Sequence, residues 1–350
     1  MRAAVWYGNK DIRIEERPVE STGVDEVQIK VVKVGICGTD LHEWWAGPIF
    51  MPTEAPHPLT GKTAPLTAGH EFSGTISAVG SNVKGFEVGD RVTCDSATWC
   101  GECENCQKGW HSLCEKSAFV GLSRDGAFAE YINVPADSVF KLPDNIPFEW
   151  GAMIEPFAVA VHAHRRARTA VGENIVVIGA GTIGLMSIHV AKIAGVGKVF
   201  AVEVAEKRKE AAAALGAIVL DPTKEDVAAI IKRETGGLGV DVVLEVVGIK
   251  ETVDLALSVA RTRGRVVIVG IFEAKIEVDW NKIVMNELEV LGHMNNGGEM
   301  PQVIALMANG TLKPEQFITG RIGLSEVVEK GYKELIKDKS HIKILVDPTY

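Results

Sequence analysis

Short runs of valine and isoleucine alternate with helical stretches from Glu173 onward, and this alternation constrains the fold of the 350-residue chain most strongly. Continuous apolar runs indicate strands that are buried on both faces, so they predict a parallel sheet covered by helices. Six such runs are typical of a doubly wound α/β domain. The runs are NIVVIGA, KVFAVEV, AIVL, VDVVLEVVG, RVVIVGIF and LEVLGHM, and helices are expected over 205–215, 224–234 and 250–260.

Residues 1 to about 150 have a different pattern, in which short β-rich segments are separated by Gly, Pro and Asn turns. We expect a small β-barrel or sandwich here. Five prolines between Trp45 and Gly69 predict a long, stiffened surface loop. The last fifty residues contain two helical patterns and one strand-like run, HIKILVDP. The expected N-terminal strands are AAVWY, DIRIEE, EVQIKVVKVGIC, EFSGTISAVGS, GDRVTCD, FAEYINVP and SVFKLP.

A glycine-rich loop, GAGTIG, follows the first of the apolar strands and opens a helix. Its glycines allow a tight turn and a close approach of the backbone to a pyrophosphate, whose charge the helix N-terminus stabilises. The loop therefore predicts a dinucleotide site. Its expected contacts are Gly179, Gly181, Thr182, Ile183 and Gly184.

An acidic residue, Glu203, ends the next strand, nineteen residues after Gly184. A carboxylate at this position accepts hydrogen bonds from the ribose hydroxyls and repels a 2′-phosphate, which favours NAD over NADP. Glu203 could instead be a solvated charge at the start of a helix. Arg208 could flank the adenosine ribose or be an ordinary surface arginine.

Four of the six cysteines, Cys100, Cys103, Cys106 and Cys114, lie within fifteen positions. In a reducing compartment such a tight cluster indicates a metal site before a disulfide. Four thiolates can close a tetrahedral shell around Zn²⁺, and closed shells are structural rather than catalytic. We therefore predict a structural zinc lobe over residues 95–115, with buried free thiols as the alternative.

A second, dispersed set joins Cys37 in GICGTDLH, His70 and Glu71 in AGHEFSG, and Glu155 in MIEPFAV. Each residue has an ordinary explanation as a core thiol, a buried histidine or a helix N-terminal acid. Together they offer one sulfur, one nitrogen and one or two oxygen ligands, the mixed shell of a zinc site that keeps a position open for substrate. Both interpretations remain open on the residues alone.

The charge balance restricts the possible partners. Lys and Arg number 37 against 46 Asp and Glu, a formal net charge of −9, so nothing electrostatic favours nucleic acid or an anionic membrane. The most apolar run, 175–191, is too short and too rich in glycine for a membrane span. No charged-then-apolar signal region opens the chain. We expect a cytoplasmic protein that binds neither nucleic acid nor membrane.

The order GICGTDLH, GHEFSG, the CxxCxxC lobe, VGDRV and GAGTIG resembles the zinc-containing medium-chain alcohol/polyol dehydrogenases over essentially the whole chain. The resemblance implies an α/β protein with a GroES-like β-barrel catalytic domain over 1–155 and 294–350. A Rossmann domain with a doubly wound parallel sheet, 156–293, would be inserted in it and bind NAD. Relatives in this family are usually dimers or tetramers, so a homo-oligomer is expected by analogy.

The same resemblance implies roles for individual residues. Cys37, His70 and Glu155 correspond to catalytic zinc ligands, with Glu71 as an alternate or transient ligand. Alcohol dehydrogenases proper have a third ligand cysteine where this chain has Glu155, so the choice between the two glutamates stays open. Asp40 is expected to orient the ring of His70, the usual role of a carboxylate beside a zinc histidine. Two zinc ions per chain and NAD are the implied cofactors.

Two further residues have expected roles in proton transfer. Thr39 can accept the proton of the substrate hydroxyl, and His42 can pass it to solvent. The alternatives are a turn hydroxyl and a surface histidine.

The substrate expectation depends on the proline-rich loop, EPFAVAVHA and KSHIKILVDP, which resemble the butanediol branch of the family. They imply hydride transfer between NAD and a secondary alcohol or vicinal diol, with 2,3-butanediol and acetoin as the pair. Sorbitol or another polyol and L-threonine are the alternative substrates. A catalytically silent nucleotide-binding relative is the remote alternative.

Overall fold

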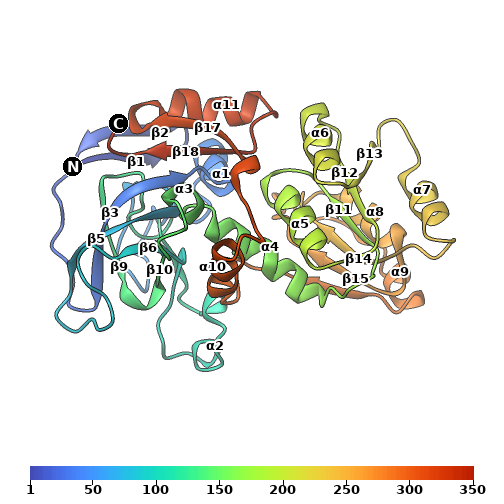
Figure 1. The fold of residues 1–350 in the computed structure, drawn as a ribbon, viewed down its shortest axis with the longest axis horizontal. Coiled ribbons are helices and arrows are strands. Elements are labelled where there is room, and N and C mark those ends of the chain that lie inside the picture. Colours follow the sequence, from blue (N-terminus) through green and yellow to red (C-terminus); the bar gives the residue numbers. More distant parts are fainter. The chain divides into compact units, whose positions relative to one another are not determined.

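The computed structural model describes residues 1–350, which form two compact units. The terminal unit joins Met1–Glu155 to Met300–Tyr350, and the inserted unit is Pro156–Glu299. The chain therefore leaves the terminal unit once and returns to it. Figure 1 shows the blue start and the red end of the chain in the same unit.

The inserted unit contains a six-stranded sheet in which every neighbouring pair of strands is parallel, in the order β13-β12-β11-β14-β15-β16. The predicted doubly wound parallel sheet is confirmed. All residues of β11, β12 and β14 are buried, which is why their sequences are continuous apolar runs. The strands are β11 Ile175–Ile178, β12 Val199–Val202, β13 Ile218–Leu220, β14 Val240–Glu245, β15 Ala260–Ile268 and β16 Glu289–Gly292.

Helices pack around this sheet in two groups (Figure 1). One group consists of α5 and α6, which contact each other, and in the other α8 contacts both α7 and α9. Their apolar faces and the strands bury one core, which includes Val176, Ile178, Val243 and Val253. The helices are α4 Ile154–Ala167, which begins in the terminal unit, α5 Thr182–Ile193, α6 Glu206–Ala214, α7 Val227–Glu234, α8 Lys250–Val259 and α9 Trp280–Met285.

The terminal unit is built on a seven-stranded sheet in the order β10-β6-β5-β3-β18-β17, with β9 also paired to β3. A three-stranded sheet, β2-β1-β4, and a short pair, β7-β8, complete it. The strands are β1 Arg2–Gly8, β2 Asp11–Glu16, β3 Glu26–Gly35, β4 Leu66–Thr67, β5 Glu71–Val79, β6 Arg91–Cys94, β7 Ala97–Thr98, β8 Ala118–Phe119, β9 Tyr131–Pro135, β10 Val139–Lys141, β17 Ile318–Gly323 and β18 Lys343–Asp347.

The seven N-terminal strands expected from the sequence are present, and so is the C-terminal strand β18. The sequence did not indicate β17, which lies parallel to β18 at the edge of the sheet. No helix or strand lies between α1 and β4, in agreement with the expected proline-rich loop. The helices of the terminal unit are α1 Gly38–Ala46, α2 Glu104–Gln107, α3 Phe148–Gly151, α10 Met300–Ala308, a π-helix Val327–Tyr332, and α11 Lys333–Lys337. None of the helices in the chain has the length and hydropathy needed to cross a membrane.

Candidate active site and metal centres

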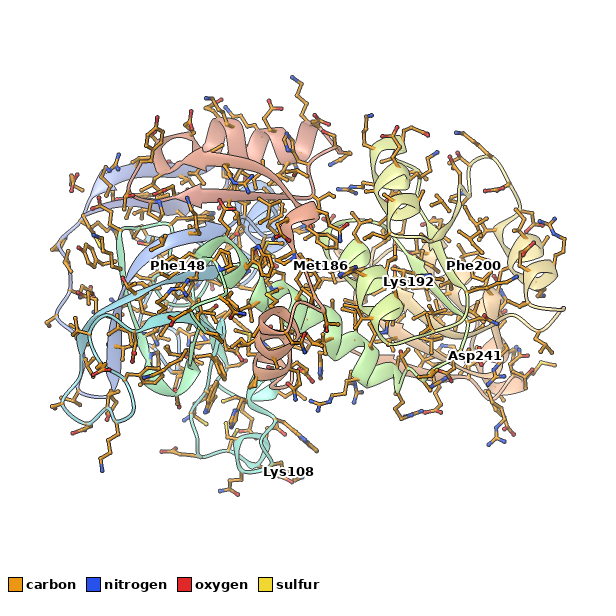
Figure 2. All side chains as sticks on the ribbon, viewed as in Figure 1. Lys108, Phe148, Met186, Lys192, Phe200 and Asp241 are labelled. Carbon is orange, nitrogen blue, oxygen red and sulfur yellow. The ribbon has the colours of Figure 1, made fainter.

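The four clustered cysteines converge in the lobe that contains α2, which Lys108 marks in Figure 2. Their sulfur atoms all lie within 4.8 Å of one another. Four of the sulfur pairs are 3.5, 3.5, 3.9 and 3.9 Å apart, far beyond the length of a disulfide bond, and all four cysteines are free. A zinc ion with bonds of about 2.3 Å to four sulfurs would place them about 3.8 Å apart, so the quartet fits a tetrahedral zinc site.

Backbone amides turn toward these sulfurs. The N–H groups of Glu102 and Cys103 donate to Cys100 Sγ, and those of Cys100 and Lys116 donate to Cys114 Sγ. Similar backbone bonds lower the pKa of Cys103 to about 6, whereas burial raises that of Cys106 to about 12. The thiolate is the form of cysteine that binds zinc. The backbone N–H groups of this irregular loop therefore stabilise the cysteines in the form in which they would bind the metal.

The second donor set brings together Cys37, His70 and Glu71, whose candidate ligand atoms also lie within 4.8 Å of one another. Cys37 is the N-cap of α1, two residues after the end of β3, whereas Glu71 begins β5 and His70 directly precedes it. Strands β3 and β5 are paired with Gly35 opposite Glu71, which brings the three donors to one end of the sheet. A Cβ at Gly35 would lie 2.4 Å from Glu71 Oε2, so a larger residue here would displace this carboxylate.

Asp40 connects the helix start to the histidine. Its Oδ2 accepts a 2.8 Å hydrogen bond from the Cys37 N–H, and its Oδ1 lies 3.5 Å from His70 Nδ1. Burial lowers the pKa of His70, but the charges of Asp40 and Cys37 outweigh it and hold that pKa well above its usual value. A metal ion in this set would displace the proton.

Glu71 has a second partner from the other end of the chain. Lys343 in β18 donates through Nζ to both carboxylate oxygens, at 2.7 and 2.5 Å, and to the Ile36 carbonyl at 2.9 Å. Both side chains are completely buried. Burial lowers the pKa of Lys343, but the charges of Glu71, Cys37 and Glu155 and the hydrogen bond to Glu71 raise it above the usual value.

Glu155 lies outside the group of donors that are within 4.8 Å of one another. Its Oε1 accepts a 2.8 Å hydrogen bond from Ser96 Oγ, and the side chain is buried. Burial raises the pKa of Glu155 to about 7, with the charge of His70 opposing this rise and that of Glu71 adding to it. Each of the two candidate glutamates thus has its own polar partner, Lys343 for Glu71 and Ser96 for Glu155.

The residues expected to move the proton both lie on α1. Thr39 Oγ1 is 3.7 Å from Cys37 Sγ, and His42 is exposed one turn further along the helix. Residues three apart on a helix share a face, so Thr39 and His42 are neighbours on α1. Of the two, Thr39 lies beside Cys37 and His42 lies at the surface.

The predicted dinucleotide loop connects β11 to α5. Gly179 has a φ of +97°, and a Cβ at Gly184 would lie 1.9 Å from the Gly179 carbonyl oxygen, so both positions require glycine. A Cβ at Gly181, the N-cap of α5, would meet nothing within 4 Å. The loop therefore leaves open space in front of a helix N-terminus, as a pyrophosphate requires.

Glu203, directly after β12, is buried and bound to this loop. Its Oε2 accepts from the Ala180 N–H at 2.9 Å, and its Oε1 accepts from the N–H groups of Val204 and Ala205. Arg208 lies 4.0 Å from Glu203 Oε2. The carboxylate therefore fixes the glycine loop against the end of β12, a structural role that its position in the sequence did not indicate.

Two family models match the chain. The alcohol dehydrogenase GroES-like domain matches residues 23–144, and the zinc-binding dehydrogenase family matches residues 182–309.

Relatives with assigned activities match along the full length. The (R,R)-butanediol dehydrogenase of Bacillus subtilis is 42% identical over 350 residues, which cover 99% of this chain and 100% of that protein. A sorbitol dehydrogenase of the same organism is 35% identical, covering 99% of this chain and 97% of that one. The crystal structure of 2R,3R-butanediol dehydrogenase from Bacillus subtilis superimposes with a TM-score of 0.94 at 42% identity, covering 99% of both chains.

Proposed function

The chain belongs to the zinc-binding alcohol dehydrogenase family, and from this premise we propose that it transfers a hydride between (R,R)-2,3-butanediol or acetoin and NAD. The family, the enzyme class and the α/β fold expected from the sequence are confirmed. The observation that carries the proposed reaction is the mixed sulfur, nitrogen and oxygen donor set of Cys37, His70 and Glu71. Such a set suits a zinc ion that keeps a position open for substrate.

We assign two zinc sites to the terminal unit. Cys37, His70 and a carboxylate of Glu71 or Glu155 would hold the catalytic ion, and the four lobe cysteines would hold the structural one. When bound, zinc supplies Lewis acidity that lowers the pKa of a substrate hydroxyl, and NAD supplies the hydride acceptor.

The chain's own residues would orient the histidine and remove a proton. Asp40 holds His70 from behind through Nδ1, which leaves Nε2 for a metal. Thr39 Oγ1 would accept the proton of the substrate hydroxyl while its own hydroxyl proton passes on toward the exposed His42, which would release a proton to solvent. In the inserted unit, Gly179, Gly181, Thr182, Ile183 and Gly184 would cradle the pyrophosphate, and Glu203 and Arg208 would flank the adenosine ribose.

A substrate panel tests the reaction. The zinc-loaded chain is expected to reduce NAD most rapidly with (R,R)-2,3-butanediol, and with a kcat/KM at least about tenfold higher than with sorbitol, xylitol, glycerol or L-threonine. NADH absorbance follows each reaction. The stereoisomers of butanediol are compared in the same assay, because the relatives at 42% identity are named for one of them.

Activity confined to sorbitol or xylitol would favour the polyol alternative, which the sorbitol dehydrogenase at 35% identity keeps open. No turnover of any butanediol isomer would refute the proposed substrate.

Repeating the panel with NADP in place of NAD tests the role of Glu203, because a carboxylate at the ribose should exclude the 2′-phosphate. Equal use of NADP would contradict that role.

We also propose that the chain forms a homo-oligomer. Trp280, Val284 and Met285 of α9 are 69, 72 and 81% exposed, and Val290 is 42% exposed on the edge strand β16. Clustered apolar side chains beside an unpaired strand edge are typical of a surface that another copy covers. Sedimentation equilibrium is expected to give dimers or tetramers, and Met285→Glu is expected to shift the mass toward the monomer. A monomeric unmodified chain would exclude this assembly.

We place the chain in the cytoplasm. All six cysteines are free, and a zinc-thiolate lobe persists in a reducing compartment.

A further inference from the structure

Four buried polar atoms beside the mixed donor set make no hydrogen bond of ordinary geometry: Asp40 Oδ1 and His70 Nδ1, which face each other at 3.5 Å, and Trp44 Nε1 and Tyr332 Oη, which have no partner. The four residues are 2, 5, 5 and 0% exposed. An unmade hydrogen bond on a buried atom costs free energy, and native proteins seldom leave several such atoms together. A shared partner for these atoms would remove the cost.

These residues come from three elements that meet at one place in the terminal unit. Asp40 and Trp44 are four residues apart on α1 and so lie on the same face. Tyr332 ends the π-helix and directs its ring against Trp44, with centroids 5.9 Å apart and planes at 73°. His70 precedes β5 and lies 3.5 Å from Asp40.

Two further observations place Tyr332 beside the donor set. Its neighbour Gly331 packs so closely against Ile36 that a Cβ would lie 2.5 Å from Ile36 Cδ1, and Ile36 directly precedes Cys37. Burial raises the pKa of the tyrosine well above its usual value, and the negative charges of Asp40 and Cys37 add to this rise. The hydroxyl therefore lies within electrostatic reach of the Asp40 carboxylate.

The unpartnered atoms are complementary in type. An indole N–H only donates, a carboxylate oxygen only accepts, and a phenol hydroxyl does both. The other oxygen of Asp40 already accepts from the Cys37 N–H at 2.8 Å. A buried water makes about three hydrogen bonds, and it could accept from Trp44, donate to Asp40 Oδ1 and pair with Tyr332.

We propose that Asp40, Trp44 and Tyr332 share one buried water molecule, and that Trp44 and Tyr332 are positioning residues that hold Asp40 against His70. The inference rests on the proposed function, in which His70 is a zinc ligand. Loss of such an outer partner typically weakens metal binding by 10- to 100-fold, because the ligand ring is no longer fixed.

Tyr332→Phe tests the inference, because it removes the hydroxyl and keeps the ring that packs against Trp44. Zinc affinity is measured by competition with a chelator, and the catalytic site is expected to bind about tenfold more weakly. The zinc of the cysteine lobe serves as an internal reference that should not change. Replacing the catalytic zinc by Co²⁺ is expected to give a shifted visible absorption spectrum in the variant. Tyr7→Phe, which removes an exposed hydroxyl bound to Glu15, is the matched control and should behave as the unmodified protein.

The outcomes separate this inference from the proposed function. If Tyr332→Phe retains both the zinc affinity and the cobalt spectrum of the unmodified chain, the positioning role is wrong while the reaction stands. If the unmodified chain binds no zinc beyond that of the lobe, both proposals fail. A crystal structure of the unmodified protein provides a test that needs no variant: water density within hydrogen-bond distance of Asp40 Oδ1, Trp44 Nε1 and Tyr332 Oη supports the inference, and its absence overturns it.

Discussion

Replacing His70 by alanine is expected to reduce kcat for diol oxidation at least about 1,000-fold while the protein stays folded. The Lewis acidity of a catalytic zinc contributes several kcal/mol to transition-state stabilisation, and about 1.4 kcal/mol corresponds to a factor of ten in rate. His70 supplies the only nitrogen of the mixed donor set. Zinc analysis should therefore show one ion per chain in place of two, and thermal unfolding should remain cooperative.

The control for this variant is His57→Ala. His57 lies in the proline-rich loop of the same unit, outside both donor sets, where its Nδ1 accepts from the Leu59 N–H. This change should leave the zinc content at two ions per chain. A His70→Ala protein that retained a tenth of the original kcat would disprove the assignment of His70 as a catalytic ligand.

Glu155→Ala is expected to abolish turnover as His70→Ala does.

Cys103→Ser, unlike His70→Ala, should have a large effect on the stability of the fold. A structural zinc contributes its binding free energy to folding, and loss of a metal site belongs to the most destabilising class of substitutions, so we expect the free energy of unfolding to fall by about 4 kcal/mol. Backbone hydrogen bonds lower the pKa of the Cys103 thiol, as they do that of Cys100, and its sulfur lies 3.5 and 3.9 Å from those of Cys106 and Cys114. Differential scanning calorimetry measures the effect, and zinc analysis again gives one ion per chain.

Glu104→Ala is the matched control for the lobe, because Glu104 is the next residue and its exposed side chain pairs only with Lys108 at the surface. It should change the unfolding free energy by no more than about 0.5 kcal/mol. If Cys103→Ser and His70→Ala proved equally destabilising, the division into a structural and a catalytic site would be wrong.

Local patterns in the sequence were enough to predict much of this molecule. The buried strands of the inserted unit are continuous Val and Ile runs, because helices cover both faces of a parallel sheet. The GAGTIG loop and the cysteine quartet each bring their residues together within one short segment, so their spacing alone indicates the site. Strand β17 was missed because ITGRIG has two glycines and no strict alternation of apolar residues.

Contacts between distant residues could not be predicted in this way. Lys343 and Glu71 are 272 residues apart, and Ser96 and Glu155 are 59 apart, so no periodic pattern connects either pair. These partners bear on the choice between the two glutamates, because a carboxylate held by an ammonium group has less freedom to approach a metal than one held by a hydroxyl. Which glutamate is free to bind a metal therefore depends on the pairing of β18 with β3, because this pairing brings Lys343 to Glu71. That pairing exists only in the folded sheet.

The position of β18 also sets the order in which the protein can be completed during synthesis. Residues 343–347 pair with β17 on one side and with β3 on the other, and β3 leaves the ribosome more than 300 residues earlier. The inserted unit ends at Glu299, so all of its strands are available while the terminal unit still lacks two of its own, β17 and β18. Since domains generally fold as units during synthesis, the second unit in the sequence can be the first to fold. Until β18 has been synthesised, the Glu71 carboxylate has no lysine partner, so the ion pair between Glu71 and Lys343 can form only after all strands of the inserted unit are available.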